Sequence, residues 1–260
     1  RRPTDILPVG FKATDDVLRS LKAHLGAGDL LSLVRALPVD TYGVFNNALW
    51  GVYPDYRNDP PKVLYPDIRP DGTWDNVFGF RRRWAKVAGG FTDEVIDHPL
   101  EHAESLDDVR AYAWPNADMF DYGTVAAQCA EVGDYGILFL SGGLGALANL
   151  MGFEKMLVDM ALRPEVVEYC FGAITDFFAE LTDRTLAAAG GRIDCICVQD
   201  DFGTQAGQLI SLGMYRRLYK PYHRRIFEAA ERHGARVMQH SCGGVFNFIP
   251  DFIEIGVDVL

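Results

Sequence analysis

Apolar residues follow two kinds of spacing along the chain, and both become regular after Pro115. Short continuous apolar runs alternate with longer segments in which apolar residues recur every three or four positions. The first pattern is typical of buried strands, and the second of helices that cover them. The predicted strands are 135–143, 195–203, 236–244 and 257–260, and the predicted helices are 119–133, 152–164, 164–191, 211–234 and 245–256.

Proline, glycine and serine residues define the predicted ends of two of these helices and a break within one of them. In 164–191, Pro164 fits the first turn and Gly190 ends the helix. In 211–234, Ser211 can cap the start, and Pro221 should kink or split the helix near its middle. The stripe that the first of them is expected to bury contains Val167, Cys170, Phe171, Ile174, Phe177, Phe178 and Leu181.

The N-terminal part is less regular. We expect a helix over 14–26, a strand over 39–45, and a short helix within 103–116 that ends before Pro115. Between the last two, 46–91 has no clean period and is rich in aromatic and turn residues. Two interpretations stay open: hairpins that form a lid over a site, or a small packed β insertion that touches no ligand.

Strands that are continuous apolar runs and alternate with helices indicate a parallel sheet with the helices outside. With 39–45, the sequence contains five such strands, whereas a closed (β/α)8 TIM barrel needs eight. We expect one α/β barrel domain over 1–260. Its other strands would lie within the irregular N-terminal third or beyond Leu260, where the sequence stops in mid-strand, as in a C-terminal truncation.

Composition and charge narrow the range of partners more than they narrow the fold. The 260 residues are 48% hydrophobic and 23% charged, with a net charge of −11 that disfavours nucleic acid and anionic membrane faces. The five cysteines are an odd number, and only Cys195 and Cys197 lie close in sequence, which indicates reduced thiols. There is no signal-peptide pattern and no apolar run near the ~20 residues of a spanning helix, so we expect a cytoplasmic protein with no membrane partner.

Polar clusters follow three predicted strands where parallel strands would end together. They lie at 140–143 (LSGG), 199–205 (QDDFGTQ) and 240–244 (HSCGG). Loops at the carboxyl ends of parallel strands form the site in α/β folds, so these clusters should gather on one face. Ser141 and Gln205 are the candidate substrate-binding residues within them. The alternative is that strand ends are polar only because they reach solvent.

His240 and Cys242 are the strongest candidates for chemistry. Because side chains alternate along a strand, these two share a face with Met238. Imidazole and thiolate both bind zinc at about 2.0–2.3 Å, which lets residues two positions apart hold one ion. A catalytic zinc usually takes three protein ligands, and the third is unassigned. The alternative is a packed histidine beside an inert thiol.

Asp200 and Asp201 are candidate catalytic carboxylates. Adjacent residues on an extended chain point opposite ways, so at most one should face the site. It could act as a general base, hold a cationic group or support a metal-bound histidine; the alternative is that it caps the following turn. The arginine triplet 81–83 could clamp substrate carboxylates or phosphates, although a solvated, salt-paired face is the favoured interpretation.

Several segments taken in order resemble the uroporphyrinogen decarboxylase superfamily, from His98 to Leu260. They are HPLEHAESLDDVRAYAWPN, FLSGGLGALANLMGFEKMLVDMALRPEVV, VQDDFGTQAGQLIS, KPYHRRIFEAAERHGARVMQHSCGG and IPDFIEIGVDVL. The resemblance implies a (β/α)8 barrel. In the pattern that this resemblance brings for comparison, true decarboxylases use no cofactor. They carry an arginine-rich N-terminal motif and an aspartate after the first strand. This chain has no such motif, and Asn46 or Asn47 stands where the aspartate is expected.

HSCG instead resembles the H-x-C-G zinc motif of the superfamily's corrinoid-dependent methyltransferases. That resemblance implies that His240 and Cys242 bind Zn2+, with a third ligand, a cysteine, beyond Leu260. It implies a partner protein that carries a corrinoid, and a small-molecule methyl donor or acceptor, with Asn47 and Gln205 lining the mouth of the barrel. Two alternatives stay open: a cofactor-free uroporphyrinogen decarboxylase, and a non-catalytic barrel that binds a tetrapyrrole or a partner. Whether the protein forms a homodimer is also open.

Overall fold

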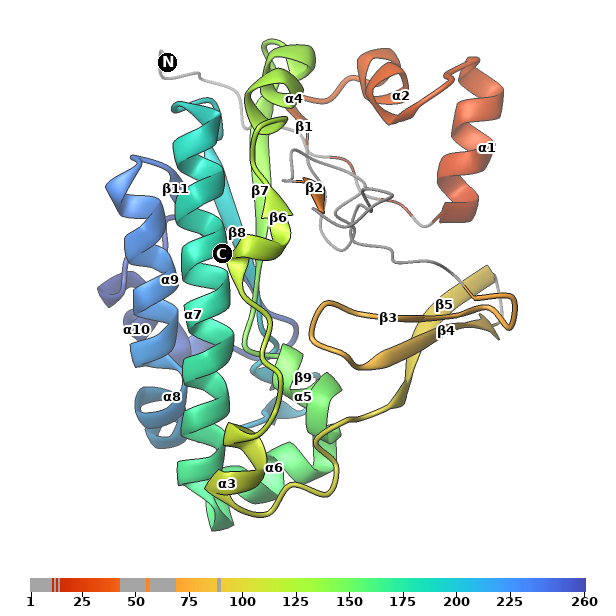
Figure 1. Ribbon diagram of the computed structural model, residues 1–260. Coiled ribbons are helices and arrows are strands. Elements are labelled where there is room, and N and C mark those ends of the chain that lie inside the picture. The colour runs from red at the N-terminus through yellow and green to blue at the C-terminus, as the bar shows by residue number, and fades with distance from the viewer. Residues whose placement is uncertain (1–10, 12, 14, 43–54, 57–68, 88–89) are drawn as a thin grey trace.

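A parallel sheet forms the centre of the computed structural model, which describes residues 11, 13, 15–42, 55–56, 69–87 and 90–260. Its strands neighbour one another in chain order (Figure 1): β1 (Thr41–Tyr42), β7 (Gly136–Gly142), β8 (Cys195–Gln199) and β11 (Arg236–His240). Val259 bridges Met238 in the same parallel sense at the far side of β11. The mixed α/β class is confirmed. Within the described residues the sheet is open, so the closed barrel stays a prediction.

Two long helices cover one face of this sheet. Figure 1 shows α7 (Pro164–Ala189) and α9 (Lys220–Arg232) side by side against β7, β8 and β11. The predicted stripe of α7 is buried at all seven positions. Pro164 lies in its first turn, and Gly190 ends it in the left-handed region at φ 58°. The apolar pattern of this helix was therefore sufficient to place its buried face.

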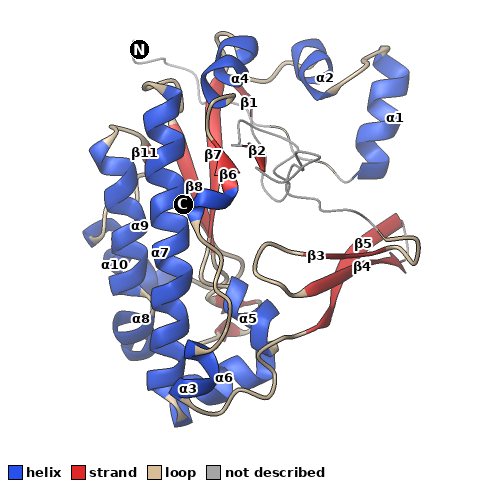
Figure 2. Cartoon of the chain, in the orientation of Figure 1, coloured by secondary structure: helices blue, strands red, loops and turns tan. Residues whose placement is uncertain are grey.

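The other helices are short, as Figure 2 shows. They are α1 (Asp15–Leu25), α2 (Leu30–Ala36), α3 (Leu106–Arg110), α4 (Val125–Val132), α5 (Ala146–Met151), α6 (Phe153–Leu162), α8 (Leu212–Leu218) and α10 (Ile249–Glu254). Pro221 stands in the first turn of α9, directly after the break from α8, so the predicted split of 211–234 is confirmed. No helix in the described part of the chain combines the length and apolarity that a membrane crossing needs.

Several predicted boundaries were wrong. The strand predicted over 236–244 ends at His240, and the helix predicted over 245–256 is α-helical only from Ile249. The helix predicted over 119–133 begins only at Val125, because Phe120–Asp121 forms a short strand, β6, that pairs with β2 (Asp55–Tyr56). The strand predicted over 195–203 ends at Gln199, and the residues that follow it form a small hairpin, β9 (Gly203–Thr204) with β10 (Gly207–Gln208). The differences at 119–133 and after Gln199 involve two-residue strands, which are too short to carry a periodic pattern.

A second, antiparallel sheet lies beside the parallel one (Figure 1). It consists of β3 (Thr73–Asp75), β4 (Arg81–Val87) and β5 (Gly90–Asp97). The sheet is anchored through Phe78, whose ring centroid lies 5.0 Å from that of Phe177 on α7. The described parts of 46–91 thus include hairpin strands that pack on the main core. Whether this region acts as a lid stays a prediction.

Asp251, at the start of α10, is a buried acceptor for two cations. Arg216 donates to both carboxylate oxygens at 3.0–3.1 Å, and Lys220 Nζ donates at 2.7 Å. The hydrogen bond from Arg216 is the main reason that the pKa of Asp251 lies below its ordinary value. A lowered pKa in the folded state stabilises the fold above the unfolded-state pKa, and this contribution is lost as the pH falls through the folded-state pKa.

We therefore expect Asp251→Asn to lower the free energy of unfolding by about 1–3 kcal/mol at pH 7. The difference from the wild type should shrink as the pH is lowered from about 5 towards 3, because the unfolded wild-type chain then takes up a proton on Asp251 that the folded state, with its lowered pKa, resists. Urea unfolding followed by circular dichroism at several pH values measures this. Asp107→Asn is the control, because that side chain is 94% exposed and should show little change. A difference for Asp251→Asn that is independent of pH would contradict the assignment.

Candidate metal centre

The end of β11 lies beside the end of β8 in parallel register. His240 pairs with Gln199, and Met238 pairs with Cys197. Burial alternates along β11: Val237 and Gln239 are buried, whereas Met238 and His240 are partly exposed. His240 therefore stands on the more open face of the sheet, at its carboxyl end, as the alternation of strand side chains requires.

Hydrogen bonds join the two loops that follow these strands. They run from Asp200 N to His240 O (3.1 Å), Phe202 N to Ser241 Oγ (2.8 Å), Cys242 N to Asp201 Oδ1 (2.7 Å) and Gly244 N to Thr204 O (3.1 Å). The backbones also approach closely, and a Cβ added to Gly203 would lie 2.5 Å from Gly244 N. Two loops distant in sequence are thus held together as one rigid unit.

This unit brings Asp201, His240 and Cys242 together. One ligand atom from each lies within 4.8 Å of the other two. The Cys242 sulfur is 3.6 Å from His240 Nε2, which in turn is 3.7 Å from Asp201 Oδ1. Cys242 and Asp201 are exposed, and the His240 side chain is 38% exposed. The cluster therefore contains a nitrogen, a sulfur and an oxygen donor that a ligand from solvent can reach.

Asp200 points away from this cluster into the interior. It is 4% exposed, and its carboxylate accepts hydrogen bonds from Leu144 N (3.0 Å) and from Gly145 N. Its Oδ2 also lies 2.8 Å from Nε2 of the fully buried His223 on α9. Asp200 thus ties the loop after β7 and helix α9 to the end of β8. Its contacts are those of a positioning residue, and a direct part in catalysis stays a prediction for either aspartate.

The predicted substrate-binding residues lie in different surroundings. Ser141 is buried, lines a cavity of about 280 Å3, and its Oγ is 2.6 Å from Thr182 Oγ1. Gln205 is exposed in the turn between β9 and β10 and does not belong to the cluster of Asp201, His240 and Cys242. Asn47, like Asn46, lies outside the described residues. The clusters at β8 and β11 are joined directly by hydrogen bonds. The cluster at β7 lies beside the one at β8, because 140–143 and Gln199 line the same cavity and a Cβ added to Gly143 would clash with Gln199 O.

The other thiols do not compete with Cys242 as ligands. None of the five cysteines is in a disulfide, and Cys242 is the exposed one. Burial raises the pKa of the Cys170 thiol and of the Cys195 thiol to about 12, so both stay protonated at neutral pH. Thiolate chemistry in the described chain therefore centres on the HSCGG loop.

The family assignment follows from residues 105–260, which match the family model described as "Uroporphyrinogen decarboxylase (URO-D)". This match spans more than half of the chain. The chain belongs to the uroporphyrinogen decarboxylase family. The resemblance that begins at His98 is thereby confirmed at the level of the family.

Other comparisons add little to the family assignment. No curated protein matches the chain. A solved structure named "methyltransferase from Methanosarcina mazei" is similar over 70% of this chain, with 17% identity and a TM-score of 0.48. The similar region covers 52% of that protein, so the chain spans about half of its length. We draw no function from a likeness of this size.

His223 is a residue of the site region that the sequence analysis did not find. Its only signal is a histidine in an otherwise basic segment, KPYHRR, at a position that the α9 pattern turns inward. Its partner Asp200 lies 23 residues earlier in the chain, and no local spacing links the two. Long-range pairs of this kind become visible only when the helix is docked on the sheet.

Proposed function

We propose that the protein is a zinc-dependent methyltransferase that moves a methyl group between a corrinoid protein and a thiol or another acceptor. The observation that carries this is the grouping of Asp201, His240 and Cys242, with their ligand atoms within 4.8 Å of one another. Membership of the uroporphyrinogen decarboxylase family supports the fold on which such a site is built. It leaves open which reaction of the family the chain performs.

The donor atoms fit zinc. Nitrogen, sulfur and carboxylate oxygen are the atoms that bind zinc in proteins, and two ligands of one tetrahedral ion lie about 3.3–3.7 Å apart. The 3.6 Å between the Cys242 sulfur and His240 Nε2 and the 3.7 Å between that nitrogen and Asp201 Oδ1 agree with this spacing. Three protein ligands with exposed side chains are typical of a catalytic rather than a structural site.

Zinc bound here would supply a Lewis acid that favours the thiolate form of a coordinated thiol. A corrinoid carried by the partner protein would supply the methyl group in electrophilic form, and Asp201, His240 and Cys242 would hold the zinc that activates the accepting thiol. A sulfur lone pair forms the new bond, and the thiol proton is released to solvent. The chain's own part is to fix the three donors on the joined loops and to keep the face of His240 open to both reactants.

The rest of the assembly follows from this proposal. Within the parallel sheet, the strands from β1 to β11 and the bridge at Val259 follow one another in chain order. This is the order of a singly wound barrel, which supports a (β/α)8 TIM barrel with 1–260 as one domain. The proposed partner is a protein that carries a corrinoid. Five cysteines outside any disulfide support a reducing compartment such as the cytoplasm.

Metal analysis of the full-length protein tests the proposal. We expect about one zinc per chain in the wild type, and a tenth of that or less in His240→Ala and in Cys242→Ser. The rate of methyl transfer from methylcobalamin to a thiol is measured from the loss of the methylcobalamin absorbance. This rate should fall at least about 100-fold in both variants. His102→Ala is the matched control, because that imidazole is 92% exposed and remote in sequence from the cluster.

Two results would overturn the proposal. One is a wild-type protein that contains no stoichiometric zinc and cannot be loaded with it. The other is turnover of uroporphyrinogen that survives chelation, which would assign the chain to cofactor-free decarboxylation.

A further inference from the structure

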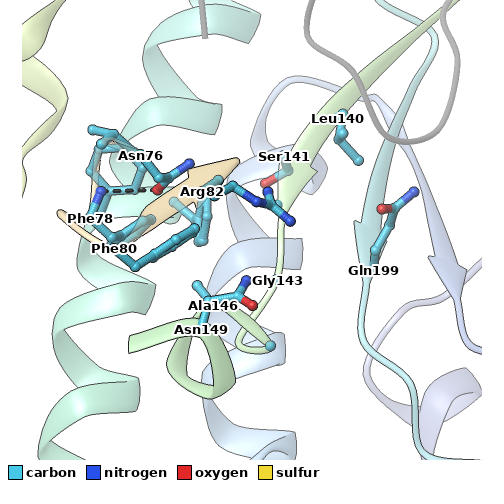
Figure 3. A pocket seen from close by; sticks show the side chains of 15 residues that line it. Asn76, Phe78, Phe80, Arg82, Leu140, Ser141, Gly143, Ala146, Asn149 and Gln199 are labelled. Carbon is cyan, nitrogen blue, oxygen red and sulfur yellow. Dashed lines mark hydrogen bonds between the residues drawn. The ribbon is translucent and has the colours of Figure 1, made fainter. Parts of the chain in front are cut away.

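A cavity of about 280 Å3 opens beside the candidate metal centre, between the two sheets (Figure 3). Its walls come from the β3–β4 segment, the end of β7, α5, α7 and Gln199 at the end of β8. Gln199 is the register partner of His240, and neighbouring strands lie about 4.8 Å apart. A ligand in this cavity would therefore lie next to the proposed zinc site.

Arg82 is the one charged residue among the described residues that line this cavity. In Figure 3 its guanidinium extends from β4 towards Ser141. Its Nε lies 2.9 Å from Asp93 Oδ2, but the N–H does not point at that oxygen. The pair holds the side chain in place and leaves both terminal nitrogens of the guanidinium for a ligand. Arg83 differs, because it pairs with Glu94 and does not line the cavity.

Three side-chain amides complete the polar wall, and one of them, Asn76, already accepts a hydrogen bond from Phe78 N through its oxygen. Asn149 on α5 and Gln199 on β8 face the same space from different sides (Figure 3). Neither amide group hydrogen-bonds to another described residue, although each carries two N–H donors and one acceptor. Ser141, in contrast, already bonds to Thr182. The polar groups left for a ligand are thus the guanidinium of Arg82, the amides of Asn149 and Gln199 and the amide nitrogen of Asn76.

Most of the remaining cavity wall is apolar. It includes the rings of Phe78, Phe80, Phe177 and Phe178 and the side chain of Leu140. Phe78 packs on both α7 rings, at centroid distances of 5.0 Å and 5.5 Å, so the rings support one another. Flat rings around a narrow space favour a flat apolar ligand body.

We infer that this cavity binds a small organic carboxylate with a flat apolar body, its carboxylate on Arg82 and the amides of Asn149 and Gln199. A planar carboxylate matches the two terminal nitrogens of a guanidinium. Phosphate would bring more charge than one guanidinium beside Asp93 can balance, in a chain with a net charge of −11. The identification of this carboxylate as the methyl donor or acceptor rests on the proposed function; its binding does not.

Benzoate is the probe, with benzamide as its neutral analogue and inorganic phosphate as a second anion. Isothermal titration is carried out on the full-length protein after chelation, so that binding is measured whether or not zinc belongs to the protein. We expect benzoate to bind more tightly than either other probe. Arg82→Gln should weaken benzoate binding at least about 10-fold, and Arg82→Lys by an intermediate factor, because lysine keeps the charge but loses the planar pair of donors.

The matched control is Arg83→Gln, the neighbouring arginine on β4, which should bind benzoate within about twofold of the wild type because its partner Glu94 lies outside the cavity. Circular dichroism checks that each variant is folded. If Arg82→Gln does not fold, Arg82→Lys and Gln199→Leu are tested in its place, and both should lower the affinity for benzoate. The inference is overturned if benzoate does not bind, if folded Arg82 variants bind it as the wild type does, or if phosphate binds more tightly. Failure of the zinc proposal with benzoate binding intact would leave the cavity assignment standing.

Discussion

Asp200→Ala is expected to lower the free energy of unfolding by about 3–5 kcal/mol. The change leaves the amide groups of Leu144 and Gly145, and the buried imidazole of His223, without their shared acceptor. Buried donors that lose a partner keep their full desolvation cost, and Asp200 is itself only 4% exposed. Unfolding by denaturant is monitored by circular dichroism after a chelator has removed any metal. This measures the loss of unfolding free energy without a contribution from bound metal.

The neighbouring aspartate provides the control for this prediction. Asp201 is exposed and accepts one hydrogen bond, from Cys242 N, so water can replace its carboxylate. Asp201→Ala should therefore cost about 1 kcal/mol or less in unfolding free energy, while lowering zinc affinity if the proposed site is right. Equal losses in the two variants would show that Asp200 does not connect the loop after β7 to α9.

The elements that could be predicted from the sequence are those with a long periodic pattern. Helix α7 is 26 residues long, so its buried stripe and both ends were evident. Strands β7, β8 and β11 were evident as apolar runs, because strands covered by helices are buried on at least one whole face. The two-residue strands β2, β6, β9 and β10 were not predicted, because their partners are set by tertiary contacts that no local pattern records.

The candidate site was predictable to the same extent. His240 and Cys242 belong to one strand and its loop, so their spacing alone predicted that they lie together. The carboxylate beside them could be narrowed only to Asp200 or Asp201, because alternation shows that the two diverge but not which one turns inward. The deciding contacts come from Leu144 and His223, which are distant in the chain.

Arg82 shows why the rest could not be predicted. In the sequence it is the middle of three arginines, and all three make ion pairs, as the favoured interpretation expected. Its place on a cavity wall depends on how the antiparallel sheet docks on α7 and β7. That docking is determined by packing around Phe78, and a stretch without regular period gives no indication of it.

Gly243→Ala is expected to disrupt the joined loops more than any exposed substitution in the chain. Gly243 has φ +76°, and a Cβ there would lie 2.5 Å from Thr204 N and 2.6 Å from Gly203 O. Both are backbone atoms that cannot rotate away, so the two loops must separate. We expect a loss of about 2–5 kcal/mol in unfolding free energy, from left-handed strain together with overpacking. Because Cys242 and Asp201 would move apart, zinc affinity should also fall at least about 10-fold.

Gly191→Ala separates the two causes. Gly191 has φ +80°, close to the value at Gly243, but a Cβ there would meet nothing within 4 Å. Its substitution should therefore show the left-handed strain alone, about 1–2 kcal/mol, with unchanged zinc affinity. Denaturant unfolding and zinc titration against a competing chelator give both quantities for the two variants. If Gly243→Ala costs no more than Gly191→Ala and binds zinc as the wild type does, then contact between the loops does not set the positions of the three donors.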